Sequence, residues 1–111
     1  MDKEFRTYEA ALGVVRGLGP LVETLRRQDR DLADQLRRAA SSVVLNLAEG
    51  SGRRGQDRMH CYRIAQGSAL EVQAALEVAQ AWGFLARDTD MEARLHQLLG
   101  MLWRLTRGLG R

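Results

Sequence analysis

Residues 37–71 read RRAASSVVLNLAEGSGRRGQDRMHCYRIAQGSALE. The stretch is rich in alanine, valine and leucine as far as residue 49, then passes through a turn of glycines and arginines, and then regains a helical composition. Alanine and leucine favour helix, whereas glycine disfavours it. The stretch therefore predicts two helices joined by a short, basic turn.

Apolar side chains recur at helical spacing on both sides of this stretch. The pattern predicts four helices, over about residues 6–27, 32–49, 56–82 and 91–108. No segment alternates with period two, so no strand is expected. Because the connections are short, neighbouring helices should run antiparallel. We therefore expect an all-α fold, an antiparallel up-down-up-down four-helix bundle that forms a single domain over residues 1–111.

The first predicted helix contains unusual residues. Its expected buried stripe consists of Tyr8, Leu12, Val15, Leu18, Val22 and Leu25. Pro20 lies inside the helix, and a proline there removes one backbone hydrogen bond. The stripe continues past it, so we expect a kink near Pro20 and not a break. Gly13 and Gly17 share one face, and they either allow close approach of another backbone or merely weaken the helix.

Glycine and capping residues predict how the later helices begin and end. Gly50 or Gly52 can take the left-handed position that closes the second helix. Gly55 can cap the third helix. The sequence Thr-Asp-Met-Glu over residues 89–92 matches the Thr-x-x-Glu capping box, which predicts Thr89 as the cap of the fourth helix.

Two polar residues of the second helix need an explanation. Asn46 is a poor interior helix residue because its amide competes for backbone hydrogen bonds. Glu49 lies in the last turn, where the helix dipole disfavours a negative charge. Arg53, Arg54 or the amides that open the next helix should compensate it. Asn46 and Glu49 either tie down the turn or bind a ligand, and we favour the turn.

Charge and cysteine content limit the functional classes. The chain carries a net charge of +3, almost all of its basic residues being arginines, which mildly favours an anionic partner. Cys61 is the only cysteine, so no intrachain disulfide can form and a reducing compartment is expected. No segment approaches the roughly 20 apolar residues of a membrane span, and the first residues lack the pattern of a signal peptide. A cytoplasmic protein with no membrane partner is expected.

The sequence contains no convincing set of catalytic or metal-binding residues. Glu92 and His96 can share a helix face, but a lone exposed pair is more typical of a helix surface than of a metal site. His60 and Cys61 are adjacent, so their side chains point about 100° apart on a helix. The SGRRG turn lacks the preceding strand and the Lys-Ser/Thr of a phosphate-binding loop. We therefore expect no enzyme, no catalytic, cofactor-binding or metal site, and no cofactor.

The central stretch resembles a known family. Residues 35–50, QLRRAASSVVLNLAEG, are similar to the signature QLRRAA-S-x-x-x-N-I-A-E-G of the four helix bundle protein family, also called 23S rRNA intervening-sequence or S23-like proteins. Residues 65–71, AQGSALE, match its A-x-G-S-x-x-E. Leu47 replaces the usual isoleucine, and Gly55 replaces a Ser or Thr cap. Asn46, Glu49, Ser68 and Glu71 lie too far apart for one site within a simple hairpin, which favours two polar sites or contacts from another helix or subunit.

The resemblance implies a ring-like homopentamer. It also implies a relation to the accessory protein of diversity-generating retroelements, which binds nucleic acid and a reverse transcriptase. Five copies of a chain with charge +3 would carry +15. The resemblance implies no enzymatic activity, and the family name alone does not establish rRNA binding.

The candidate nucleic-acid site is a cluster of arginines. Its members are Arg37, Arg38, Arg53, Arg54, Arg58 and Arg63. These six arginines face only two acids between residues 37 and 63, and guanidinium groups match phosphates well. No aromatic residue among them predicts base stacking, so binding should involve the backbone of RNA or DNA. The alternative is an oligomeric scaffold or protein-interaction module whose arginines are solvated or pair between subunits.

Overall fold

The computed structural model describes residues 2–107, which form four α-helices and no strand within that range. The helices are α1 (Lys3–Arg26), α2 (Arg30–Ser51), α3 (Gly55–Ala81) and α4 (Thr89–Arg107). The all-α prediction is confirmed, and most helix ends lie within three residues of the predicted ones. Gly108, the predicted end of the fourth helix, lies outside the described residues.

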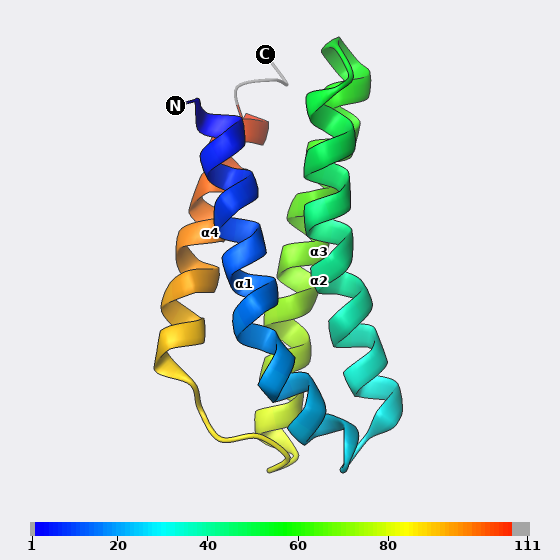
Figure 1. Ribbon diagram of the computed structural model, residues 1–111, viewed down its shortest axis with the longest axis vertical. Helices are drawn as coiled ribbons and strands as arrows, with labels where there is room; N and C mark the ends of the chain where they lie inside the picture. The colour runs from blue at the N-terminus through cyan, green and yellow to red at the C-terminus, as the bar shows by residue number, and fades with distance from the viewer. Residues whose placement is uncertain (1, 108–111) are drawn as a thin grey trace.

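The helices form an elongated bundle. Figure 1 shows the chain descending through α1, rising through α2, descending through α3 and rising through α4. The main packing pairs are α1–α2, α2–α3, α3–α4 and α1–α4, so each helix contacts two neighbours. The bundle measures 42 × 23 × 22 Å. None of the described helices is long and apolar enough to cross a lipid bilayer.

Small side chains make up much of the interior, especially on α3. The predicted α3 stripe is confirmed, because Tyr62, Ala65, Ala69, Val72, Leu76 and Ala79 are all buried. The predicted α1 stripe is wrong in its first half. Ala11 and Val14 are buried there, whereas Tyr8, Leu12 and Val15 are half-buried. The larger side chains lie one position away because α1 contacts both α2 and α4, and the narrow centre between them takes the smaller residues.

The first helix runs without interruption through Pro20, as the continuous stripe predicts. The kink at Pro20 stays a prediction. Gly17 faces α4, because a Cβ atom there would lie 2.6 Å from the Met91 side chain. The equivalent atom at Gly13 would lie 3.4 Å from a guanidinium nitrogen of Arg94. These glycines therefore make room for α4 side chains.

Helix α4 begins one residue earlier than the capping box predicts. Asp88 is the cap, since its carboxylate accepts a hydrogen bond from the Met91 amide at 2.9 Å. Thr89 is already the first helical residue. Glu92 does not reach back to close a box; its carboxylate instead accepts hydrogen bonds from Arg87 at 2.8 to 3.1 Å. The Glu92 amide, which Thr89 would cap, already donates to the Asp88 carbonyl at 3.0 Å, whereas the Met91 amide is free for the Asp88 carboxylate.

The glycine predictions around the α2–α3 turn are also wrong. Gly52 ends α2 with ordinary right-handed angles, and Gly50 is a buried helical residue. The left-handed residue is Gly55, with φ of +58°. Gly55 therefore reverses the chain as the first residue of α3, and Arg54 occupies the cap position without a side-chain hydrogen bond.

Candidate nucleic-acid interface

The turn between α2 and α3 forms an exposed, basic end of the bundle. Residues 51–57 are all exposed, and Figure 1 shows this turn extending from one end of the bundle. Arg53 and Arg54 lie within it, and Arg63 is exposed two turns along α3. We call Arg53, Arg54 and Arg63 the tip arginines. They are the predicted site residues that the structure leaves open to a partner at this end.

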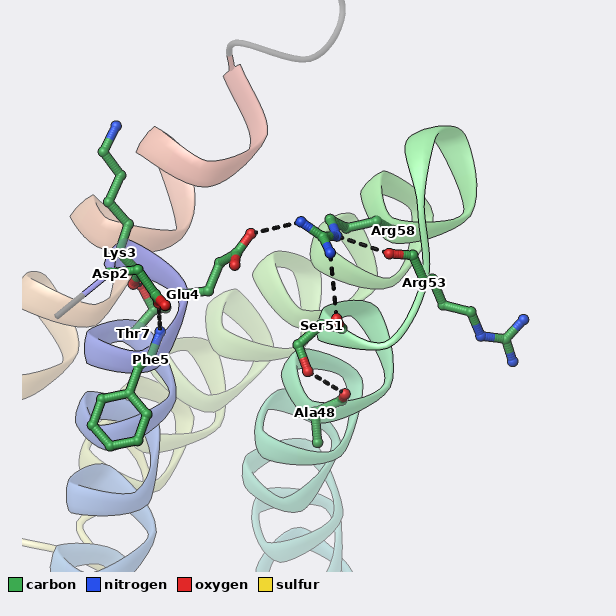
Figure 2. A network of polar contacts seen from close by, with 9 residues as sticks. All are labelled: Asp2, Lys3, Glu4, Phe5, Thr7, Ala48, Ser51, Arg53 and Arg58. Atoms are coloured by element: carbon green, nitrogen blue, oxygen red, sulfur yellow. Dashed lines mark hydrogen bonds and ion pairs between the residues drawn. The ribbon is translucent and has the colours of Figure 1, made fainter.

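Arg58, another member of the predicted cluster, holds the turn together and is less open to a partner than the tip arginines. Its guanidinium donates hydrogen bonds to the carbonyl oxygens of Arg53 at 3.0 Å and Ser51 at 3.3 Å. It also pairs with the Glu4 carboxylate at 3.0 Å. Figure 2 shows this guanidinium lying between the first turn of α1 and the α2–α3 turn. Arg58 thus satisfies one carbonyl at the end of α2 and one in the turn, and it connects the turn to α1.

Glu49 is compensated as expected, though weakly. The Arg53 guanidinium lies 3.5 Å from its carboxylate, and both side chains are more than half exposed. An exposed pair of this kind contributes little to stability, so it leaves Arg53 available to other anions. The Cys61 thiol lies 3.7 Å from the same carboxylate. Burial, followed by the charge of Glu49, raises the pKa of Cys61, which disfavours a reactive thiolate.

Arg37 and Arg38 do not belong to the tip. They are exposed on α2, about 20 Å along the helix from its end at Ser51, at the rise of 1.5 Å per residue. Both contribute to lowering the pKa of Asp34, after the larger effect of the hydrogen bond from Arg26. The predicted arginine cluster therefore divides into the tip arginines, the turn-bracing Arg58, and this separate pair.

The signature polar residues also divide, into two sites within one subunit. Asn46 donates hydrogen bonds to the carbonyl and hydroxyl oxygens of Ser42, at 2.9 and 3.1 Å. The Ser68 hydroxyl donates to that Ser42 hydroxyl at 2.9 Å, which connects α3 to α2. Asn46 therefore joins the middle of the hairpin and not its turn, contrary to the prediction. Its amide is satisfied one helical turn earlier on its own helix, which removes the reason to reach the turn.

Glu71 lies near the Ser42–Ser68 contact but outside that hydrogen-bond chain. Its exposed carboxylate lines a shallow cavity of about 330 Å³ with Gln35, Arg38 and the two serines. Among the described residues no ion pair within 4.0 Å includes Glu71 or Arg38. The cavity presents both signs of charge, and it is separate from the tip.

Gly50 and Tyr62, close to the α2–α3 turn, have structural roles that the sequence does not reveal. A Cβ atom at Gly50 would lie 2.6 Å from the Tyr62 ring, so only glycine lets α2 pass the tyrosine at this distance. The Tyr62 hydroxyl is buried and finds no hydrogen-bond partner among the described residues. Burial, followed by the nearby carboxylate of Glu4, raises the pKa of Tyr62 to about 12. The Ala-Glu-Gly segment of the signature is the only sequence signal for Gly50.

Among residues 2–107, the acid, histidine and cysteine side chains form no group of three or more that is placed to hold a metal ion. His60 is exposed whereas Cys61 is buried, so these neighbours face different environments. Glu92 is engaged by Arg87, whose hydrogen bonds lower its pKa, and His96 is exposed on the same helix.

Comparison with known proteins gives a family and a fold. A family model described as the 23S rRNA-intervening sequence protein matches residues 3–104. No curated protein matches the chain. The fold is similar to the crystal structure of a protein with unknown function from the S23 ribosomal protein family of Bacteroides thetaiotaomicron, with a TM-score of 0.85 and 16% identity. That similarity covers 96% of this chain and 99% of the other. Since the family model spans nearly the whole bundle, the chain belongs to the 23S rRNA-intervening sequence protein family.

Proposed function

We propose that this protein is a non-enzymatic, homo-oligomeric accessory protein that binds the backbone of RNA or DNA through its tip arginines. The observation that carries the proposal is the exposure of Arg53 and Arg54 in a turn at one end of the bundle. Within residues 2–107, the one acid paired with a tip arginine is Glu49, at 3.5 Å from Arg53. Guanidinium groups in such a position can exchange a weak carboxylate contact for phosphate oxygens.

Phosphate contacts give the binding a definite physical character. Each neutralised phosphate releases counterions, so affinity should fall steeply as salt rises. The residues around the tip arginines supply charge and no aromatic surface: Ser51, Gly52 and Gly55 are the neighbours in the turn. Such contacts position a nucleic acid without reading its bases. We therefore propose sequence-independent recognition of a duplex or a structured RNA.

Oligomerisation would strengthen a weak basic site. The family resemblance supports a pentamer, and five tips in one ring would present a multivalent surface. Small and apolar side chains exposed on α3, among them Gly67, Leu70 and Val78, support contact between subunits. A reverse transcriptase would be a further partner if the gene lies within a retroelement.

The test is a matched pair of double variants. Arg53→Ala/Arg54→Ala removes two tip charges, and Arg27→Ala/Arg30→Ala removes two exposed charges at the α1–α2 end of the bundle. Fluorescence anisotropy with a labelled RNA duplex at low salt should show about tenfold or greater weakening for the tip variant. The control variant should retain most of the affinity. Equal weakening in both would refute the tip assignment, and absence of binding by the wild type at low salt would refute nucleic-acid binding.

The second candidate is an oligomeric scaffold without a nucleic-acid role. The specific observation in its favour is the set of exposed apolar side chains on and just after α3: Ile64, Leu70, Val78 and Trp82. A wild-type protein that forms a discrete oligomer and does not shift the duplex at low salt would establish this candidate over the first.

A further inference from the structure

A second group of cationic residues lies on the α1–α4 side of the bundle, at the end that also carries the α2–α3 turn (Figure 1). The beginning of α1 and the end of α4 line a cavity of about 290 Å³. Its lining consists of Lys3, Arg6, Thr7, Gln97, Met101 and Arg104. Three of these six residues are cationic and none is acidic. We call Lys3, Arg6 and Arg104 the cavity cations.

The cavity cations are not neutralised by the described part of the protein. None of the five ion pairs within residues 2–107 includes any of the three. Glu9, three residues after Arg6, is exposed and makes no ion pair within 4.0 Å among the described residues. The two acids on either side of Lys3 have other partners. Asp2 caps the amide of Phe5 at 2.7 Å, and Glu4 pairs with Arg58. Figure 2 shows Lys3 and Glu4 leaving the first turn of α1 in different directions.

Helix electrostatics explain only part of this arrangement. Arg104 lies near the end of α4, where a positive charge is favourable. Lys3, in contrast, is the first residue of α1, where the helix dipole disfavours a positive charge. Like charges on residues that line one cavity also repel one another. An anion bound between the cavity cations would offset both the unfavourable helix dipole at Lys3 and the repulsion between the like charges.

We propose that the cavity cations bind a phosphate group that carries more than one negative charge. The two guanidinium groups supply forked donors that match phosphate oxygens, and the lysine adds a point charge. The Gln97 amide is a further donor, whereas the Thr7 hydroxyl already donates to the Lys3 carbonyl at 2.7 Å. A volume near 290 Å³ is at the small end of ligand sites. It suits a terminal phosphate or a pyrophosphate better than a large apolar ligand, and the site does not depend on the tip arginines.

Calorimetric titration of the full-length protein with inorganic pyrophosphate at low salt tests the proposal. The wild type and Arg27→Ala/Arg30→Ala should bind alike, whereas Arg6→Ala/Arg104→Ala should bind about tenfold or more weakly. Arg53→Ala/Arg54→Ala should bind as the wild type does. Lys3→Gln changes only an exposed amino group, so it serves as the second variant if the arginine pair disturbs folding. Absence of binding by the wild type, or equal binding by the cavity variants, would overturn the proposal.

A second titration identifies the source of the phosphate. A single-stranded oligonucleotide with a 5′-phosphate is compared with the same strand ending in a 5′-hydroxyl. If Arg6→Ala/Arg104→Ala weakens only the phosphorylated strand, the cavity takes a nucleic-acid end. If that variant weakens pyrophosphate and leaves both strands unchanged, the cavity takes a free phosphate compound. Either result supports the phosphate site, and loss of strand binding in the tip variant reports separately on the proposed function.

Discussion

Among individual residues, Gly50 shows how closely α2 and α3 approach beneath the tip. A methyl group there would meet the Tyr62 ring at 2.6 Å and the Cys61 Cβ at 3.0 Å. We therefore expect Gly50→Ala to destabilise the protein by about 1–3 kcal/mol through overpacking. Urea unfolding followed by circular dichroism measures this change.

Gly100 supplies the matched control. It is a helical glycine on α4, and the nearest atom to a methyl group there would be a guanidinium nitrogen of Arg104 at 3.7 Å, an ordinary van der Waals contact. Gly100→Ala should therefore stabilise the helix by about 0.5–1 kcal/mol. Similar effects of the two substitutions would contradict the assigned role of Gly50. The sequence alone predicts a left-handed end of the helix at Gly50 or Gly52. It does not reveal the close approach at Gly50, because the Tyr62 ring that forbids a side chain comes from the next helix.

Among the helices, α4 begins at a sequence that offers two possible cap residues. Residues 88–92, Asp-Thr-Asp-Met-Glu, offer both Asp88 and Thr89 as caps, and the structure uses Asp88. Asp88→Ala should therefore cost about 1 kcal/mol in thermal or urea unfolding. Thr89→Ala, a change at the first helical position, should alter the free energy of unfolding by no more than about 0.5 kcal/mol, because alanine favours helix at least as well as threonine. If Thr89→Ala destabilised the protein more than Asp88→Ala, Thr89 would be the cap and the predicted capping box would be correct.

The contact between α1 and the α2–α3 turn gives a prediction about binding. A carboxylate oxygen of Glu4 lies 3.0 Å from a guanidinium nitrogen of Arg58, so Glu4 would compete with phosphate for this arginine. Glu4→Gln should raise the affinity for an RNA duplex and steepen its salt dependence by up to about one unit of slope. Glu9→Gln removes the same charge from an exposed position of α1. An equal gain in both variants would show that only net charge matters.

Helix positions were predictable from the sequence, because apolar spacing and glycine mark them locally. The buried face of the first half of α1 was not predictable, since two neighbouring rows of apolar residues both fit a helical period. Only packing against α2 and α4 selects Ala11 and Val14 for burial. The role of Arg58 was equally hidden. Its partner Glu4 lies 54 residues earlier in the chain, and no local pattern connects them.

Across the bundle, the candidate sites follow from how charge is distributed along its length. Six arginines between residues 37 and 63 predict one basic surface, yet helix geometry places Arg37 and Arg38 far from Arg53 along α2. The sequence did not predict the cavity cations, because they are far apart in the chain and close together only in the fold. Lys3 and Arg6 lie about a hundred residues before Arg104 in the sequence, and only the antiparallel return of the chain brings α1 beside α4.

The outer face of α3 provides the last prediction, which concerns assembly. Leu70 is 51% exposed and Val78 43% exposed, with Gly67 and Ala74 also exposed on the same helix. A surface on which small and apolar side chains recur over several turns favours contact with another subunit. Leu70→Glu should therefore reduce the oligomer to monomers without unfolding them, because the side chain is already outside the core.

Leu45→Glu is the matched control for this face. Leu45 is 65% exposed on α2, so the substitution adds the same charge at another exposed leucine of the bundle. Light scattering coupled to size-exclusion chromatography should give the wild-type mass for Leu45→Glu and a mass near 12.5 kDa for Leu70→Glu. A wild type that is already monomeric, or a Leu70→Glu variant of unchanged mass, would exclude α3 as the subunit contact. If only the mass of Leu70→Glu is unchanged, the proposed five-fold ring would need another face. If the wild type is monomeric, nucleic-acid binding would rest on a single set of tip arginines.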